Sequence, residues 1–310
     1  MVLWVLTILM VIVLSFSFMV KTDTLSTLSF KGGMERKLIA EAGIERGIAE
    51  LYYRNFYKDQ TVELEGKEVW NTDGTPHTGK LGNGYYSVGI TDESGKIDIN
   101  MMTDASAIIL KSLLSNSGVS VEDAETIADS VMDWKDEDNL VRLHGAEDDY
   151  YSSLPNPYKA KNANFDTVEE LLLVKGVTSE LLYGTKDKKG IINFLTVNSK
   201  MNRINVNAAP KEVLMALPNM TPELAEAIVN YRQTKEIKTL TEIQGMVGGD
   251  FSSLSRYITT SGTNMFTIDS SGSKENEKGV YTIRATVALA SGGDEPHTVV
   301  YYKSPIALRQ

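Results

Sequence analysis

The chain has 310 residues, with 31 Lys and Arg against 41 Asp and Glu, so its formal net charge is −10. It contains no cysteine, and its three histidines, His77, His144 and His297, lie far apart in the sequence. The lack of Cys excludes a disulfide framework, a thiol nucleophile, a Cys-type zinc site and an iron–sulfur cluster. The acidic balance argues against a broad surface for nucleic-acid phosphates, and the length predicts about two domains.

The chain begins with an uncharged stretch. Residues 2–20 carry no charged side chain, and their polar groups are the hydroxyls of Thr7, Ser15 and Ser17. A helix needs about 20 apolar residues to cross a hydrocarbon core of about 30 Å. A secretory signal is the alternative, but it fits less well because such a signal has a basic start and a small-residue cleavage site. We therefore expect a retained membrane anchor.

Helical spacing continues beyond the anchor. Between residues 21 and 57 the apolar side chains fall mostly on one side of a helix, and Gly32-Gly33 is a candidate kink. We expect one long helix that runs from the membrane into an amphipathic half; the alternative is a single-pass anchor followed by a linker. The apolar residues of this second half are Leu25, Leu28, Leu38, Ile39, Ala42, Ala49, Leu51, Tyr52 and Phe56.

Short β-patterns lie on both sides of a helical middle. Turn signals at residues 72–74, 82–84 and 93–95 separate the first strands, which predicts an antiparallel meander. The simplest fold is α+β: a long N-terminal helix on an antiparallel sheet whose strands come from both ends of the soluble part, interrupted by a helical insertion. The expected strands are residues 61–64, 84–90, 96–99, 257–260, 265–268, 280–288 and 298–302.

The helical middle contains clear capping signals. Ser120 precedes a predicted helix through Met132, Asp166-Thr167 opens a second, and Thr221-Pro222 opens a third with Pro at its first position.

The middle also contains an internal repeat. A shift of 43 residues aligns Glu169 with Glu212 and Thr178 with Thr221, and each copy is predicted to be a helix, a tight hairpin and a second capped helix. Such helix–hairpin–helix units often grip a DNA phosphate through backbone amides. Here the first unit is acidic, and Pro218 in the second hairpin has no N–H to donate. We expect protein contact, with DNA binding as the alternative.

The densest charge lies between residues 122 and 149, where eleven acids face two basic residues. A solvated acidic surface is the plain interpretation. However, Asp136, Asp138 and Glu147 occupy the first, third and twelfth places of a 12-residue loop, which is the spacing of an EF-hand calcium site, although the glycine of that motif is absent. Oxygen ligands suit Ca²⁺ better than zinc or iron. We expect a structural Ca²⁺ site within residues 133–149.

No catalytic motif emerges from the sequence. It has no Gly-rich phosphate loop, no nucleophile elbow and no Ser–His–Asp pattern. Paired carboxylates would suit a glycoside hydrolase, but their concentration in one loop rather than across a cleft argues against it. We expect no enzyme activity, and a carboxylate hydrolase is the enzymatic alternative.

Several strings spread over nearly the whole chain share a pattern with one known family. They are the uncharged N-terminal helix, EAGIERGIAEL, DESGKIDIN, DWKDED followed by GAEDDYY, FDTVEELLLVKGVTSELLYG, RINVNAAPKEVLMALPNMTPELAEAIVNYR and YITTSG. Together they resemble the K-type minor pseudopilins of the type II secretion system, general secretion pathway protein K.

The resemblance implies a pilin-like fold interrupted by a large α-helical domain with helix–hairpin–helix (SAM-like) repeats. It divides the chain into a transmembrane part (1–20), the pilin-like helix and first strands (21–103), the inserted α-helical domain (104–250) and C-terminal strands that complete the sheet (251–310). It implies a single-pass protein of the bacterial inner membrane with its soluble part in the periplasm. This part assembles at the pseudopilus tip with the I- and J-type minor pseudopilins, to initiate or cap the pseudopilus in protein export across the outer membrane.

The resemblance also implies further partners and a metal. Other pseudopilins, the inner membrane and exported proteins are candidate partners, whereas a membrane-tethered, competence-type DNA-binding protein is the alternative function. The family binds calcium in its α-helical domain, and the candidate ligands carried onto this sequence are Asp133, Asp136, Asp138, Glu147, Asp148 and Asp149.

Two features of the family bear on the start of the chain. Its members are made with a short basic leader that ends in Gly, so we expect this sequence to be in mature form or to start too late. Most pilin subunits also carry a Glu near the fifth mature position, which neutralises the terminal amine of a neighbour. Residues 2–6 offer no carboxylate. This fits a subunit at the tip of a filament, because no further subunit lies above it whose terminal amine would need to be neutralised.

Overall fold

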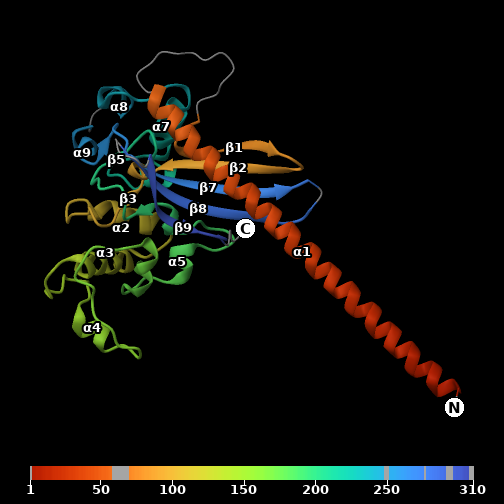
Figure 1. Ribbon diagram of the computed structural model, residues 1–310. Helices are drawn as coiled ribbons and strands as arrows, with labels where there is room; N and C mark the ends of the chain where they lie inside the picture. Colours follow the sequence, from red (N-terminus) through yellow and green to blue (C-terminus); the bar gives the residue numbers. More distant parts are fainter. Residues whose placement is uncertain (1, 58–69, 248–250, 276, 291–295, 307–310) are drawn as a thin grey trace.

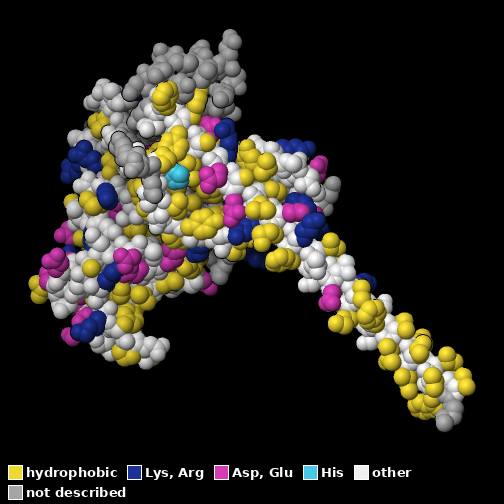
Figure 2. Space-filling view, viewed as in Figure 1, with side chains coloured by type: hydrophobic (Ala, Val, Ile, Leu, Met, Phe, Trp, Pro, Cys, Tyr) yellow, Lys and Arg dark blue, Asp and Glu magenta, His cyan; other side chains and the backbone are white. Residues whose placement is uncertain are grey.

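The computed structural model describes residues 2–57, 70–247, 251–275, 277–290 and 296–306. Its first element, α1 (Val2–Tyr57), is one helix that continues through Gly32-Gly33, so the expected kink does not end it. Figure 1 shows that the N-terminal half of α1 projects away from the folded body, while its C-terminal half lies along the sheet. The helix contains a window of mean hydropathy 2.6 with none of its residues buried, and it is long enough to cross a membrane. The side chains of the projecting half are mostly hydrophobic (Figure 2), as in a single-pass anchor.

A five-stranded antiparallel sheet lies against the C-terminal half of α1. Its strand order is β1-β2-β7-β8-β9. The prediction of an antiparallel sheet with strands from both ends of the soluble part is confirmed, whereas the expected strand at residues 61–64 falls outside the described residues. The strands are β1 (Asp73–Leu81), β2 (Gly84–Asp92), β7 (Met265–Lys274), β8 (Val280–Leu289) and β9 (His297–Lys303).

The helix α1 covers one face of this sheet. Ala40, Ile44, Ile48 and Leu51 follow each other at helical spacing and pack against buried side chains of β2, β7 and β8, such as Ile268. Of the apolar residues that were predicted to lie mostly on one side of this helix, Ile39 and Leu51 are buried. The exposed members of the predicted face are Leu25, Leu28, Leu38, Ala49 and Phe56.

A large insertion, residues 93–264, leaves the sheet at the end of β2 and returns at the start of β7. These two strands are neighbours in the sheet, with Asp92 paired to Phe266. Its helices are α2 (Ala107–Asn116), α3 (Val121–Lys135), α4 (Asp148–Ser152), α5 (Ser179–Tyr183), α6 (Lys211–Met215), α7 (Pro222–Thr234), α8 (Leu240–Val247) and α9 (Phe251–Ser255), with 3-10 turns η1 (Glu93–Gly95), η2 (Val168–Leu173) and η3 (Ile191–Asn193).

Two short parallel strand pairs also belong to the insertion. β3 (Ile97–Asp98) pairs with β4 (Leu195–Thr196), and β5 (Ile204–Asn205) pairs with β6 (Ile258–Thr259). The predicted strands 96–99 and 257–260 therefore exist, but the prediction that the first belongs to an antiparallel meander was wrong. An alternating pattern indicates a strand but does not select its partner.

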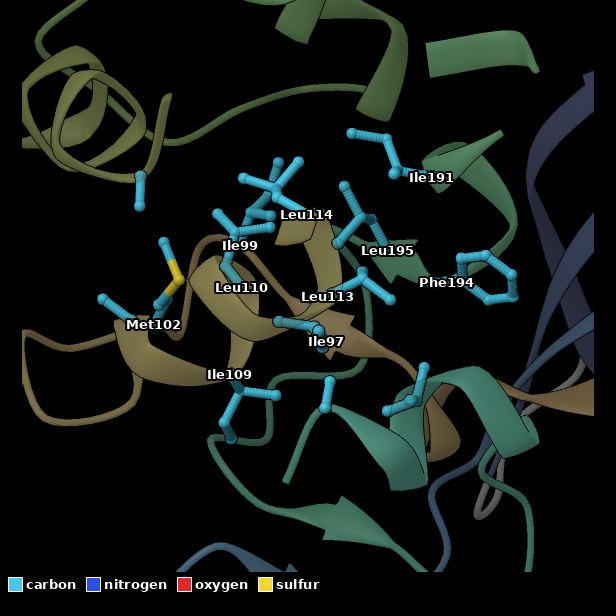
Figure 3. Packing of buried hydrophobic residues seen from close by; sticks show 14 of the residues in the cluster. Ile97, Ile99, Met102, Ile109, Leu110, Leu113, Leu114, Ile191, Phe194 and Leu195 are labelled. Carbon is cyan, nitrogen blue, oxygen red and sulfur yellow. The ribbon is translucent and has the colours of Figure 1, made fainter. Parts of the chain in front are cut away.

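The insertion has its own hydrophobic core, which is separate from the core beneath α1. Figure 3 shows Ile97 and Ile99 from the β3 segment meeting Leu110, Leu113 and Leu114 of α2 and neighbouring side chains of η3 and β4. Leu114 and Ile99 are completely buried. The buried residues therefore form two separate hydrophobic clusters, one in the insertion and one beneath α1.

One carboxylate ties the two stems of the insertion together. Asp92, 4% exposed, accepts hydrogen bonds from the N–H and hydroxyl of Ser94 at 2.9 and 2.7 Å. It also accepts one from the Thr263 hydroxyl at 2.8 Å, across the other stem. Burial raises the pKa of Asp92. The first part of the DESGKIDIN string therefore has a structural explanation, as the joint between sheet and insertion.

Candidate metal centre

The acidic cluster begins where α3 ends. Ser120 caps α3 as predicted, since its hydroxyl accepts a hydrogen bond from the Asp123 N–H at 3.1 Å. The helix ends at Lys135, and the next residue, Asp136, closes its last turn through an N–H bond to the Met132 carbonyl. An irregular loop then leads to Glu147, which directly precedes α4. The cluster therefore joins the end of one helix to the start of another.

The loop brings three carboxylates together. One oxygen from each of Asp136, Asp138 and Glu147 lies within 4.8 Å of the other two. These are the three side chains that the 12-residue spacing selects. Asp138 is exposed and accepts a hydrogen bond from the Leu140 N–H at 2.8 Å, a contact within the loop.

The cluster contains buried oxygens without partners. Glu147 is 2% exposed, and neither of its carboxylate oxygens has a hydrogen-bond partner within the described residues. The Oδ1 atom of Asp136 is likewise buried and without one. Burial, followed by the negative charges of Asp133 and Asp136, raises the pKa of Glu147 to about 7. An orphaned, buried carboxylate among like charges is the arrangement that a hard divalent cation would stabilise.

Asp133 has a different role from the three clustered acids. It is fully buried at the end of α3, and its Oδ1 accepts a hydrogen bond from Arg142 Nη1 at 2.8 Å. The same guanidinium contacts Asp136 Oδ2. Arg142 therefore fastens the loop to α3 and pairs with Asp133 and Asp136, whereas no ion pair reaches Glu147 among the residues that the structure describes.

The remaining candidate ligands lie outside the cluster. Asp148 accepts a hydrogen bond from the Ala160 N–H at 2.9 Å and pairs with Lys159 at 3.2 Å. Asp149 is exposed. Of the six predicted ligands, the structure brings together Asp136, Asp138 and Glu147.

Residues that the sequence reasoning did not single out hold the loop in place. The ammonium of Lys175 donates to the carbonyls of Gly145 at 3.0 Å and His144 at 3.4 Å. Tyr151 is completely buried and contacts the rings of Trp134 and Tyr158. In the sequence, Tyr150 and Tyr151 directly follow the last of the six predicted ligands, and this adjacency was the available signal that aromatic side chains pack next to the loop.

The two repeated units differ in their hairpins. In the first, η2 is a 3-10 turn rather than an α-helix, and α5 has five residues. Gly176, with φ of +85°, packs so closely that an added Cβ would lie 2.9 Å from Ile127 of α3. In the second, α6 and α7 flank Asn219, which has φ of +59°. Thr178 and Thr221 cap the second helix of each unit as predicted.

The fold and the acidic loop define a class of protein: an α+β protein with one anchor-length N-terminal helix, and an insertion that carries a candidate cation site. A chain in the crystal structure of the GspK-GspI-GspJ complex from the enterotoxigenic Escherichia coli type 2 secretion system has the same fold, with a TM-score of 0.61 and 18% identity. The match covers 92% of this chain and 100% of that chain.

Sequence comparisons then relate two segments of the chain to one family. Residues 95–184 and 204–260 match two family models, each described as type II secretion system (T2SS), protein K. Both segments are similar to this family, in agreement with the resemblance.

Curated relatives agree with the family models. Type II secretion system protein K of Pectobacterium carotovorum subsp. carotovorum is 32% identical over 41% of this chain, and that of Pseudomonas aeruginosa is 30% identical over 58%. The chain spans 38% and 56% of the length of these two relatives, respectively.

Proposed function

We propose that this protein is a K-type minor pseudopilin at the tip of a type II secretion pseudopilus. The observation that carries the proposal is the family match of both segments of the insertion, because the insertion is the part that distinguishes this fold from a plain helix-on-sheet subunit. Its role is structural rather than catalytic: it is stored in the bacterial inner membrane through α1, with the soluble part in the periplasm, and it initiates or caps the pseudopilus during protein export.

The position of the insertion supports a place at the tip. Figure 1 shows it gathered at the end of the sheet remote from the N-terminus of α1. In a filament whose subunits stack with parallel N-terminal helices, a further subunit would have to occupy the space above this end. The insertion fills that space, so the subunit fits best as the last one.

The partners follow from the same reasoning. The solved chain that has the same fold belongs to a complex named for GspK, GspI and GspJ. We therefore propose I- and J-type minor pseudopilins as neighbours of this chain. Other pseudopilins and the inner membrane contact α1, and exported proteins are further candidates.

The DNA-binding alternative is less favourable. A helix–hairpin–helix phosphate site needs free donors at its hairpin. Here the backbone N–H of Lys175 in the first hairpin already donates to the Tyr151 hydroxyl at 3.3 Å, and Gly176 packs against α3. We propose that both repeated units are helix–hairpin–helix-like scaffolds within an inserted α-helical domain, used for packing and protein contact. Retention of the soluble part on duplex DNA at low salt would favour the alternative.

We also propose a structural Ca²⁺ ion held by Asp136, Asp138 and Glu147. The residues fit it, because they offer oxygen ligands only, and Asp136 and Glu147 have buried oxygens without a hydrogen-bond partner in the described part of the chain. The ion would supply the positive charge that Arg142 does not bring to Glu147. It would join the end of α3 to the start of α4, and thereby fix the loop between residues 136 and 147.

The functional proposal is tested in the bacterium that encodes the chain. Deletion of the gene should leave the exported enzymes of the type II system in the periplasm, and a plasmid copy should restore export. A copy that lacks the insertion but keeps α1 and the sheet should not restore it. Normal export in the deletion strain would contradict the proposal.

A further inference from the structure

A cleft of about 790 Å³ separates the insertion from the sheet face opposite α1. Thr267, Asp269 and Arg284 form part of its floor, and they alternate along β7 and β8 with Ile268 and Ile283, which face α1. The other walls come from β9 and from the segment between α5 and η3. This volume is within the range of ligand-binding clefts, roughly 300–1,000 Å³.

The acidic groups on the cleft floor are already satisfied. Arg284 makes a two-pronged pair with Asp269 at 2.7 and 2.8 Å. Glu169 of η2 accepts hydrogen bonds from the Tyr301 hydroxyl at 2.7 Å and from Lys303 at 3.0 Å. These pairs cancel the charge of the floor, so that the floor itself neither attracts nor repels an ion strongly.

The rim of the cleft carries lysines that are less strongly paired with acids than the cations of the floor. Residues 185–189 (the lysine hairpin) form a tight loop closed by a bridge between Gly184 and Lys189, and by a hydrogen bond from the Thr185 N–H to the Lys188 carbonyl at 2.9 Å. Lys186 and Lys188 are exposed, and neither has an ion-pair partner among the residues that the structure describes. Lys189 pairs with Glu212 at 3.0 Å, but both side chains are well exposed, so solvent weakens this pair.

The charges that line the cleft indicate which kind of ligand it would bind. Six cationic and four acidic side chains line the cleft of a chain whose net charge is −10. The floor acids are paired internally, and the lysine hairpin carries one acid, Asp187, against Lys186, Lys188 and Lys189. The excess positive charge therefore lies at the lysine hairpin. The complementary ligand is an anion with several carboxylates, since a single charge would meet only one part of this rim.

The shape of the cleft favours an extended peptide over a small anion. Ile192, Phe194 and Ile306 provide apolar wall, which a carboxylate alone would not use. Tyr301 and Lys303 belong to β9, the last strand of the described sheet, whose other side has no strand partner there. An open strand edge next to a cleft is a site at which an extended chain can pair its backbone.

We propose that this cleft binds an extended acidic segment of a partner polypeptide, with the lysine hairpin receiving its carboxylates. The site is distinct from the candidate metal centre, and its test does not depend on the proposed place at the pseudopilus tip.

The test uses the full chain in detergent micelles and fluorescence anisotropy. The probe is an octapeptide that alternates Glu and Val and carries a neutral fluorophore; the reference probe has Gln in place of Glu. We expect the acidic probe to bind and its affinity to fall when the salt concentration is raised. The triple variant K186Q/K188Q/K189Q should lose at least about tenfold in affinity, whereas the charge-matched control K200Q/K238Q/K278Q should bind as the parent does.

Three results would overturn the proposal. The first is equal binding of the Glu and Gln probes, and the second is unchanged affinity of the hairpin variant. The third is full displacement of the probe by millimolar inorganic phosphate, which would indicate a small-anion site instead. Equal far-UV circular dichroism and unfolding midpoints of the two triple variants would show that neither has lost its fold.

Discussion

Glu147 is the residue on which the acidic loop depends most. It is buried, its carboxylate oxygens have no hydrogen-bond partner in the described part of the chain, and its pKa is raised to about 7 by burial and by neighbouring acids. A folded-state pKa above the ordinary value means that the folded protein binds this proton more tightly than the unfolded chain does. Without a cation, the contribution of Glu147 to the free energy of unfolding is therefore greatest below the ordinary pKa of 4.5 and is lost as the pH rises through about 7.

Replacing Glu147 by Gln should have opposite effects with and without calcium. In chelator at pH 7.5 the variant E147Q should unfold at a higher temperature than the parent, by about 4 °C for about 2 kcal/mol, because the buried charge is gone. In millimolar Ca²⁺ it should lose most of the stabilisation that the parent gains. Thermal unfolding followed by circular dichroism measures both.

The control for this experiment is D149N, because Asp149 is exposed and lies outside the cluster. It should unfold as the parent does in both solutions. If calcium leaves the midpoint of the parent unchanged, the proposed metal site is wrong.

The pH profile gives a second test of the same site. In chelator the unfolding midpoint should fall between pH 5 and 7 by more than it does in saturating Ca²⁺, because the ion binds the deprotonated carboxylate in place of the proton. The difference between the two profiles isolates the cluster from the other acids. Parallel profiles would show that Glu147 does not titrate at a cation site.

Sequence spacing predicted the centre of this site but not its surroundings. Asp136, Asp138 and Glu147 were selectable because ligand spacing in a short loop is a local property. Asp133 and Asp148 have the same chemistry, but one faces Arg142 and the other faces the Ala160 N–H, and such tertiary partners leave no local pattern.

At the scale of single elements, the packing of α1 on the sheet depends on two small residues. Gly43 lies so close to β7 that an added Cβ would fall 2.1 Å from Ser270 Oγ, and a Cβ on Gly47 would lie 2.9 Å from Ile268. The EAGIERGIAEL string thus places its glycines where the helix approaches the sheet. Gly33 has nothing within 4 Å of the same position.

Alanine in place of the closely packed Gly43 and in place of the uncrowded Gly33 should change the free energy of unfolding in opposite directions. G43A should destabilise the protein by about 1–2 kcal/mol, because overpacking exceeds the gain in helix propensity. G33A should be neutral or stabilising by up to about 1 kcal/mol, since it improves the helix without a clash. Denaturant unfolding of the two variants in the same detergent provides the comparison, and a stabilised G43A would contradict the close packing of Gly43 against β7.

There are physical reasons why the sequence patterns did not predict some elements and pairings. β1 contains Pro76 and three glycines or prolines in all within nine residues, and such composition indicates a turn. It pairs as an edge strand, where a missing N–H is tolerated. The strands β3 and β6 were found, but their parallel partners lie about 98 and 54 residues away, beyond the reach of local reasoning.

For the whole molecule, one chain combines three parts: an anchor-length helix, a sheet that the helix covers, and an insertion with its own core. The stems of the insertion meet at Asp92, and Glu169 connects η2 to β9 through Tyr301. These contacts hold the insertion at one end of the sheet. A terminal subunit needs a fixed, bulky end. Such an end leaves the filament side of the subunit free to contact its neighbours, and it blocks the addition of a further subunit on the other side.

The most direct test of the tip assignment is reconstitution with its expected neighbours. The soluble part, residues 22–310, would be co-expressed with the soluble parts of the I- and J-type minor pseudopilins from the same bacterium, and the purified material measured by light scattering. A stable complex that contains one copy of each of the three chains is the predicted result. A chain that elutes alone, with the other two subunits correctly folded, would contradict the assignment.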